Sequence, residues 1–327
     1  MLTVKDLTKS YGSKVALNGI SFTVGDGEIV GFLGPNGAGK STTMNIITGC
    51  LSATSGSVKI DDYDILEDAF QAKKLLGYLP ELPPLYQDMT VGEYLGFVYE
   101  LKNCTFKRRQ HLDEVMEVTK TGDVRGRVIG NLSKGYKQRV GIAQTLIGNP
   151  KVIVLDEPTV GLDPRQIIEI RNLVRTLGRD HTVVLSTHIL SEVQAVCDRV
   201  IIINKGKLCA DTRVDDLPRL AGGKRRESVK ICGPQSAVLN ALRTLSGVSY
   251  ASPLAEHDLD STTFVVESSD GLDVRKAIFN LCAQNGWAII GLESLGVSME
   301  DVFLSLLDRT DGAARGGKTR AAVKGGE

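Results

Sequence analysis

Gly34-Pro-Asn-Gly-Ala-Gly39-Lys40-Ser41 is the stretch that decides the fold. It fits the pattern GxxxxGK[ST], and it lies between a predicted strand over Glu28–Leu33 and a predicted helix from about Lys40 to Gly49. The glycines allow successive backbone N–H groups to turn toward a phosphate without Cβ collisions, and the helix adds the positive end of its dipole. A glycine-rich turn is the alternative, but the flanking strand and helix favour a phosphate-binding loop. The pattern GxGxxG is absent, which disfavours a dinucleotide-binding fold.

This loop supplies side chains as well as backbone groups. Lys40 is predicted to place a positive charge beside the β- and γ-phosphates of a nucleotide, and Ser41 to offer a hydroxyl ligand to Mg²⁺. The other loop residues predicted to bind the nucleotide are Gly34, Pro35, Asn36, Gly37, Ala38, Gly39 and Thr42.

A second motif, Lys151-Val-Ile-Val-Leu155-Asp156-Glu157-Pro158, is an apolar strand pattern that ends in two carboxylates. Such a strand places both carboxylates at the carboxyl edge of a sheet, where ligands bind in α/β folds. Asp156 is predicted to hold Mg²⁺ through water, and Glu157 to orient and polarise the attacking water as a general base. Read alone, Asp-Glu-Pro is also a plausible strand-ending turn, but the nearby phosphate loop favours the catalytic interpretation.

The elements around these motifs predict an α/β fold. Residues 1–25 alternate between apolar and polar positions, which predicts an antiparallel pair of strands. Residues 90–120 contain few Gly or Pro and are predicted to be helical. Apolar strands at 151–155 and 182–186 flank a predicted helix at 165–177, and this alternation favours a mostly parallel sheet covered on both faces.

A smaller domain is predicted after residue 216. The stretch 217–227 contains Pro, a Gly-Gly pair and adjacent cations, and it is interpreted as a linker. Residues 228–308 show the order βαββαβ with a last helix at Met299–Leu307, which predicts a small α+β domain of the ferredoxin-like type. Residues 309–327 are rich in Gly and Lys/Arg with little to bury, so disorder is expected there.

A third motif, Leu132-Ser133-Lys134-Gly135-Tyr136-Lys137-Gln138, points to a known family. By itself, Ser133 is a good N-cap for the helix that follows. The motif also resembles the signature sequence of ABC-transporter ATPases, usually LSGGQ. Three further matches share that family's order and spacing. Tyr11 matches the aromatic residue that stacks on adenine, Gly161-Leu-Asp163 resembles the loop after the catalytic base, and His188 matches the switch histidine that contacts the γ-phosphate.

The resemblance implies a P-loop NTPase of the ABC type over residues 1–216, with a parallel core sheet, an antiparallel β-subdomain and a helical subdomain. It implies an enzyme that binds ATP with Mg²⁺ and hydrolyses it to ADP and phosphate. In this family two ATPase domains stack head to tail, so Ser133 and Gly135 of one copy would grip the γ-phosphate bound by Lys40 of the other. A homodimer is expected because all motifs for two active sites are present, and pairing with a sister ATPase is the alternative.

Two positions depart from the family pattern. The signature has Lys134 and Tyr136 where Gly and Gln are usual, and Lys134 either adds phosphate attraction or is simply solvated. The usual metal-contacting Gln is replaced by Glu81, in Gly77-Tyr-Leu-Pro80-Glu81. A carboxylate accepts hydrogen bonds and binds cations but does not donate. We therefore expect Glu81 to remain near Mg²⁺.

A short C-terminal motif indicates which kind of transporter partner to expect. Ser298-Met-Glu-Asp-Val-Phe-Leu-Ser305 resembles the ending found after single cassettes of ABC-2-type exporters (multidrug, sodium and gliding-associated systems), although an ordinary amphipathic helix also accounts for it. No signal peptide pattern opens the chain, and no apolar run approaches the ~20 residues needed to cross a bilayer. The expected partner is therefore a separate integral membrane permease. The chain is expected to be cytoplasmic and peripheral on the inner face of the membrane.

Composition disfavours other classes of function. Lys+Arg and Asp+Glu both number 39, so the net charge is zero and no nucleic acid partner is expected. The cysteines are scattered singly without a CxxC pair, which disfavours a disulfide framework or metal site and fits a reducing cytosol. The alternative function is a soluble, non-transport ABC ATPase that acts as a nucleotide-dependent switch on a cytosolic partner.

Overall fold

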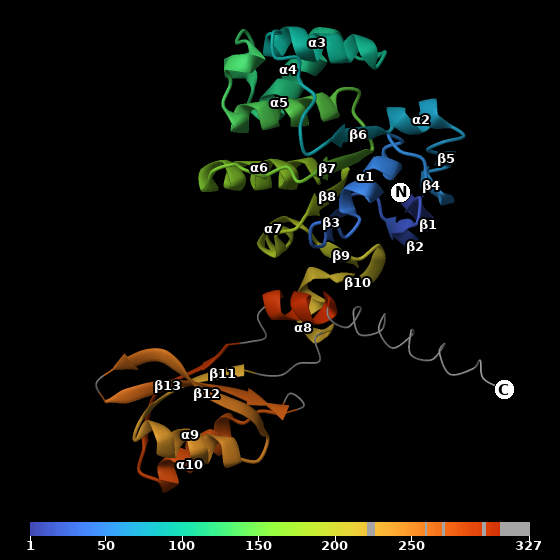
Figure 1. The fold of residues 1–327 in the computed structure, drawn as a ribbon. Helices are drawn as coiled ribbons and strands as arrows, with labels where there is room; N and C mark the ends of the chain where they lie inside the picture. Colours follow the sequence, from blue (N-terminus) through green and yellow to red (C-terminus); the bar gives the residue numbers. More distant parts are fainter. Residues whose placement is uncertain (221–225, 259, 270–271, 296–298, 308–327) are drawn as a thin grey trace, which may run out of the picture. The chain divides into compact units, whose positions relative to one another are not determined.

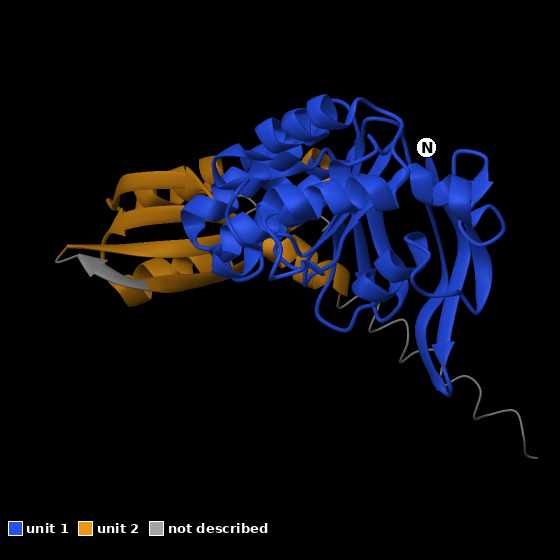
Figure 2. Ribbon diagram, turned by 90° about the horizontal axis from the view of Figure 1, so that it is seen from above, with its two compact units in different colours: residues 1–214 blue, residues 215–327 orange. Residues whose placement is uncertain are grey.

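The computed structural model describes residues 1–220, 226–258, 260–269, 272–295 and 299–307. Figure 2 shows the two compact units of the chain, Met1–Val214 and Asp215–Glu327, in different colours. Among the described residues, no helix combines the length and the apolar character that crossing a bilayer requires. The tail predicted at 309–327 lies outside the described residues.

The described residues at both ends of the predicted linker over 217–227 have regular structure. Residues Leu217–Leu220 form a short helix, α8, and Arg226 already begins strand β11. Leu217 is fully buried.

The first unit is built on a six-stranded sheet with the order β10-β9-β3-β8-β7-β6 (Figure 1). Neighbouring strands from β9 to β6 are parallel, and β10 is antiparallel to β9. Every residue of β3, β7 and β8 is buried, as their apolar sequences predict. The α/β class with a parallel core sheet is thus confirmed. The strands are β3 (Ile29–Leu33), β6 (Leu76–Leu79), β7 (Val152–Asp156), β8 (Thr182–Thr187), β9 (Arg199–Asn204) and β10 (Lys207–Arg213).

A second, antiparallel sheet has the order β2-β1-β4-β5. Helix α1 (Lys40–Ile47) packs between the two sheets, because Met44, Ile46 and Ile47 share one apolar core with residues from both. This packing fixes the N-terminus of α1 beside the carboxyl ends of the central strands. The strands of the second sheet are β1 (Leu2–Tyr11), β2 (Lys14–Val24), β4 (Ser55–Ile60) and β5 (Tyr63–Asp64).

The stretch 90–120, which was predicted to be helical, contains two helices. Thr90 begins α3 through a capping box with Glu93, and a break follows α3, where Asn103 takes a left-handed φ of 50°. Helix α4 then starts at Arg108. The helices of the first unit other than α1 are α2 (Ala69–Lys74), α3 (Val91–Leu101), α4 (Arg108–Thr119), α5 (Lys134–Leu146), α6 (Pro164–Leu177) and α7 (Leu190–Val196).

The second unit contains a four-stranded antiparallel sheet with the order β12-β13-β11-β14. Helices α9 and α10 contribute Val238, Leu242, Ile278 and Cys282 to a single core beneath the sheet. The chain order βαββαβ with this strand order is the ferredoxin-like arrangement that the sequence predicts. Residues 299–307 are helical. The elements are β11 (Arg226–Cys232), α9 (Gln235–Thr244), β12 (Val248–Asp258), β13 (Ser261–Ser268), α10 (Arg275–Gln284) and β14 (Ala288–Ser294).

Gly77→Ala is expected to lower the free energy of unfolding by roughly 1–3 kcal/mol. The added Cβ on β6 would lie 2.5 Å from the carbonyl oxygen of Thr145 in α5. Denaturation followed by circular dichroism measures the change. Gly122→Ala is the matched control because no described heavy atom lies within 4 Å of its added Cβ, and its effect should stay within about 0.5 kcal/mol. Equal losses in both variants would contradict the close packing of α5 on β6.

Candidate active site

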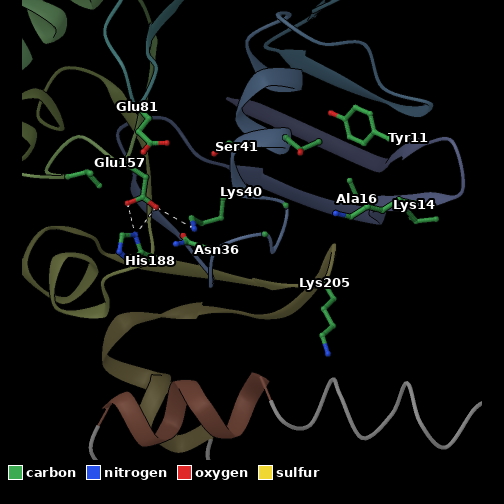
Figure 3. A pocket seen from close by; sticks show the side chains of 15 residues that line it. Tyr11, Lys14, Ala16, Asn36, Lys40, Ser41, Glu81, Glu157, His188 and Lys205 are labelled. Carbon is green, nitrogen blue, oxygen red and sulfur yellow. Dashed lines mark hydrogen bonds and ion pairs between the residues drawn. The ribbon is translucent and has the colours of Figure 1, made fainter.

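A cleft of about 760 Å³ opens at the carboxyl ends of the central strands (Figure 3). The lining includes ten residues that the sequence singled out: Tyr11, Asn36, Gly37, Gly39, Lys40, Ser41, Thr42, Glu81, Glu157 and His188. Lys14, Val15, Ala16, Val160 and Lys205 also line it, and the sequence did not indicate them. A cleft of this size accommodates a small-molecule ligand.

The glycine-rich loop connects β3 to the N-terminus of α1. Gly39 is the N-cap of α1 with a φ of 112°, a conformation that side chains with a Cβ rarely adopt. An added Cβ at Gly34 would collide with the carbonyl oxygen of Ile203 in β9. The Pro35 carbonyl accepts from the Ala38 N–H at 3.1 Å, which closes the loop. These constraints explain why the loop needs glycine at both positions.

Lys40 and Glu157 form a buried ion pair at the floor of the cleft. The side-chain nitrogen of Lys40 lies 3.4 Å from Glu157 Oε1, and the two residues are only 5% and 6% exposed. Lys40 also donates to the carbonyl oxygens of Gly34 at 2.8 Å and of Pro35 at 3.4 Å. The loop thus provides the acceptors that a buried ammonium group needs.

Glu157 also contacts His188. Nδ1 of His188 lies 2.9 Å from Oε2 and 3.0 Å from Oε1 of Glu157. Glu157 has a left-handed φ of 49°, and its backbone N–H donates to the Ser186 carbonyl at 2.9 Å. This turn at the end of β7 directs the carboxylate into the cleft, toward Lys40 and His188 (Figure 3). A left-handed conformation at a residue other than glycine costs energy and is frequent at functional sites.

Asp156 lies deeper than Glu157 and does not line the cleft. It is 3% exposed, and its Oδ1 has no hydrogen-bond partner within the described part of the chain. Burial raises the pKa of this carboxyl, whereas hydrogen bonding by the hydroxyls of Ser186 and Ser41 lowers the pKa. The charges of Glu157 and Glu81 raise the pKa further. A buried carboxylate oxygen without a partner, close to other oxygen donors, is the environment of a hard cation.

The predicted signature residues lie outside this cleft. Ser133 is the N-cap of α5, and its hydroxyl accepts from the Tyr136 N–H at 3.4 Å. Gly135 packs so closely on Gln166 that an added Cβ would lie 2.6 Å from the Gln166 side chain. Within one chain, therefore, the structure does not bring Ser133 and Gly135 together with the phosphate loop.

The two unusual signature residues contact other parts of the same chain. The Lys134 side chain lies against Gly161, in the loop that follows Glu157. The hydroxyl of Tyr136 donates to Asp123 at 2.7 Å.

Tyr11 stands at the end of β1, half exposed, where the hairpin turn begins. Lys14 pairs with Tyr11 across this two-residue turn, so the hairpin register was the signal that could have placed Lys14 in the cleft. Lys205 comes from the turn between β9 and β10, and no local pattern links it to the other lining residues.

Comparisons with known proteins show which family the chain resembles. Residues 17–160 match the family model described as ABC transporter. The chain is 33% identical over 317 residues to the linearmycin resistance ATP-binding protein of Bacillus subtilis (strain 168), covering 95% of this chain and 99% of that relative. It is 31% identical over 316 residues to the bacitracin transport ATP-binding protein of Bacillus licheniformis, covering 94% and 97%.

Solved structures resemble the first part of the chain. A dimeric ATP-binding cassette in a post-hydrolysis state with ADP and Pi has 28% identity and a TM-score of 0.59, with 65% of this chain and 99% of that chain covered. CbiO1 from Clostridium perfringens, part of an ABC transporter complex, has 29% identity and a TM-score of 0.60, with 66% and 89% covered. The two Bacillus relatives are each more than 30% identical to this chain over nearly their whole length. The chain therefore belongs to the family of ABC transporter ATP-binding proteins.

Proposed function

We propose that this chain binds and hydrolyses ATP and that it drives export through a separate membrane permease. The observation that carries the proposal is the cluster of Lys40, Glu157 and His188 beside the glycine-rich loop. The Glu157 carboxylate lies 3.4 Å from the side-chain nitrogen of Lys40 and 2.9 Å from Nδ1 of His188. A phosphate-binding cation and a carboxylate base in one cleft are the groups that phosphoryl transfer to water needs.

Mg²⁺ fits the residues present. Ser41, Asp156 and Glu81 offer a hydroxyl and two carboxylates, the hard oxygen donors that Mg²⁺ prefers. The Asp156 Oδ1 atom lacks a hydrogen-bond partner within the described residues, and a nearby cation would compensate its burial. Mg²⁺ bound by these residues would neutralise the charge of the β- and γ-phosphates.

The catalytic roles follow from the contacts. Glu157 is positioned as the general base that accepts a proton from the attacking water, and its own carboxylate is oriented by His188. Lys40 would move from the loop carbonyls to the β- and γ-phosphates, which are stronger, charged acceptors. His188 is 40% exposed on its side chain, so it is also able to reach the γ-phosphate.

The proposed active form is a dimer, preferably a homodimer. Ser133 and Gly135 begin α5 away from the cleft of their own chain, and a helix N-terminus is a favourable site for a phosphate. One related cassette was solved as a dimer with ADP and Pi. In such an arrangement each γ-phosphate would lie between the Lys40 loop of one copy and the Ser133 helix end of the other.

The export role rests on the relatives. Two of them are named for linearmycin resistance and bacitracin transport, and another solved cassette is part of a transporter complex. The described residues contain no helix that spans a membrane, so the proposal assigns the transport path to a partner. The chain would then bind to the inner face of the membrane through that permease.

Glu157→Gln is expected to lower kcat about a hundredfold or more, because an amide does not accept the proton of the attacking water. ATP binding should persist, since the Lys40 loop is unchanged. Lys40→Ala is the counterpart and should weaken ATP binding roughly tenfold or more. Phosphate release and equilibrium binding of a fluorescent ATP analogue separate the two effects. If both variants hydrolysed ATP at the parental rate, the proposed function would be wrong.

Ser133→Ala is expected to lower turnover about tenfold, because its hydroxyl would contact the γ-phosphate held by the other copy. The affinity of a single copy for ATP should stay unchanged, since Ser133 lies outside its own cleft. Thr90→Ala is the matched control, because Thr90 caps α3 in the same way; it should lose stability and keep its turnover. Weakened ATP binding by dilute, monomeric Ser133→Ala would contradict the contact across the dimer.

A further inference from the structure

Glu192 is a buried carboxylate that has no role in the proposed function. It lies in α7 and is 1% exposed. One of its oxygens accepts a hydrogen bond from the hydroxyl of Thr159, and the other accepts from the hydroxyl of Thr187 at 2.7 Å. The Ile189 N–H donates to the Thr187 hydroxyl oxygen at 3.1 Å, so the Thr187 proton is left to point at Glu192.

The two threonines belong to the two segments that carry the catalytic pair. Thr159 follows Glu157 by two positions, and Thr187 is the residue before His188. The register of β7 with β8 ends before Thr159 and Thr187. Glu192 therefore extends the connection between the two segments beyond the last paired residues of β7 and β8, Asp156 and Ser186.

Because the Glu192 carboxylate is buried, its two hydrogen bonds favour one arrangement of the two segments over others. A carboxylate removed from water is strongly destabilised unless hydrogen bonds satisfy it. Thr159 and Thr187 are themselves 5% and 0% exposed, so water does not readily replace either hydroxyl. The arrangement is favourable only when both segments are in place at once, and this is also the arrangement in which Glu157 and His188 lie 2.9 Å apart.

We propose that Glu192 is a positioning residue for ATP hydrolysis, which holds Glu157 against His188 by fixing the segment after β7 to the last residue of β8. Glu192 does not line the cleft itself, so it acts through these segments and not on the nucleotide. The inference rests on the proposed function, because it assigns a role in the same reaction.

The test uses the full-length chain and measures phosphate release over a range of ATP concentrations. Glu192→Ala and Thr159→Val should each lower kcat about tenfold and leave the KM for ATP within about twofold, since only the catalytic geometry is disturbed. In a His188→Ala background, Glu192→Ala should lower kcat less than about twofold further, because coupled residues are non-additive. Glu192→Gln keeps an oxygen acceptor and should recover part of the lost kcat.

Thr182→Val is the matched control at the opposite end of β8. Thr182 is as buried as Glu192, and its hydroxyl accepts from the Gly27 N–H at 3.0 Å. This variant also loses a buried hydroxyl, so its melting temperature should fall about as far as that of Thr159→Val. Its kcat should stay at the parental value.

Three outcomes would overturn the inference. Parental kcat in Thr159→Val would do so even if Glu192→Ala failed to fold, because Val closely replaces Thr in size. Full additivity of Glu192→Ala with His188→Ala, or an equal loss of kcat in Thr182→Val, would reduce Glu192 to a residue that only stabilises the fold. Absence of hydrolysis in the parental chain would instead contradict the proposed function, so the two failures are distinct.

Discussion

The site depends on one buried contact, between the ammonium group of Lys40 and the carboxylate of Glu157. Neither charge is stable in the interior alone, so each requires the other and the loop carbonyls that surround Lys40. The contact joins the segment after β3 to the segment after β7, across the end of β8. His188 follows β8 and completes the group. Three adjacent parallel strands therefore each deliver one reactive side chain to the same edge.

The remaining architecture keeps this edge in place. The antiparallel sheet and α1 share one core with the central sheet, which fixes the loop that precedes α1. Helix α7 supplies Glu192, whose hydrogen bonds to Thr159 and Thr187 hold the segment after β7 against the end of β8. These buried hydrogen bonds lie directly beside the side chains proposed for the reaction, where they restrict the positions of those side chains. The signature helix α5 is anchored separately, on β6, and presents Ser133 away from its own cleft.

The sequence predicted the parts that are encoded locally. The glycine-rich loop and the Asp156–Glu157 strand end could be placed because each is a short pattern between elements of clear periodicity. The α/β class followed from continuous apolar strands. Other features arise from contacts between residues distant in the sequence, and no local pattern predicts them. Lys205 lines the cleft from the β9–β10 turn, and Glu192 contacts Thr159, which lies 33 residues earlier in the chain.

Sedimentation velocity of the Glu157→Gln variant, with and without ATP and Mg²⁺, tests the central claim most directly. The claim is that the γ-phosphate is shared between the Lys40 loop of one copy and the Ser133 helix end of another. The account predicts a monomer without nucleotide and a dimer with it, and loss of the dimer when Ser133 is also replaced by Ala. A chain that is saturated with ATP and remains monomeric at every concentration would contradict the account.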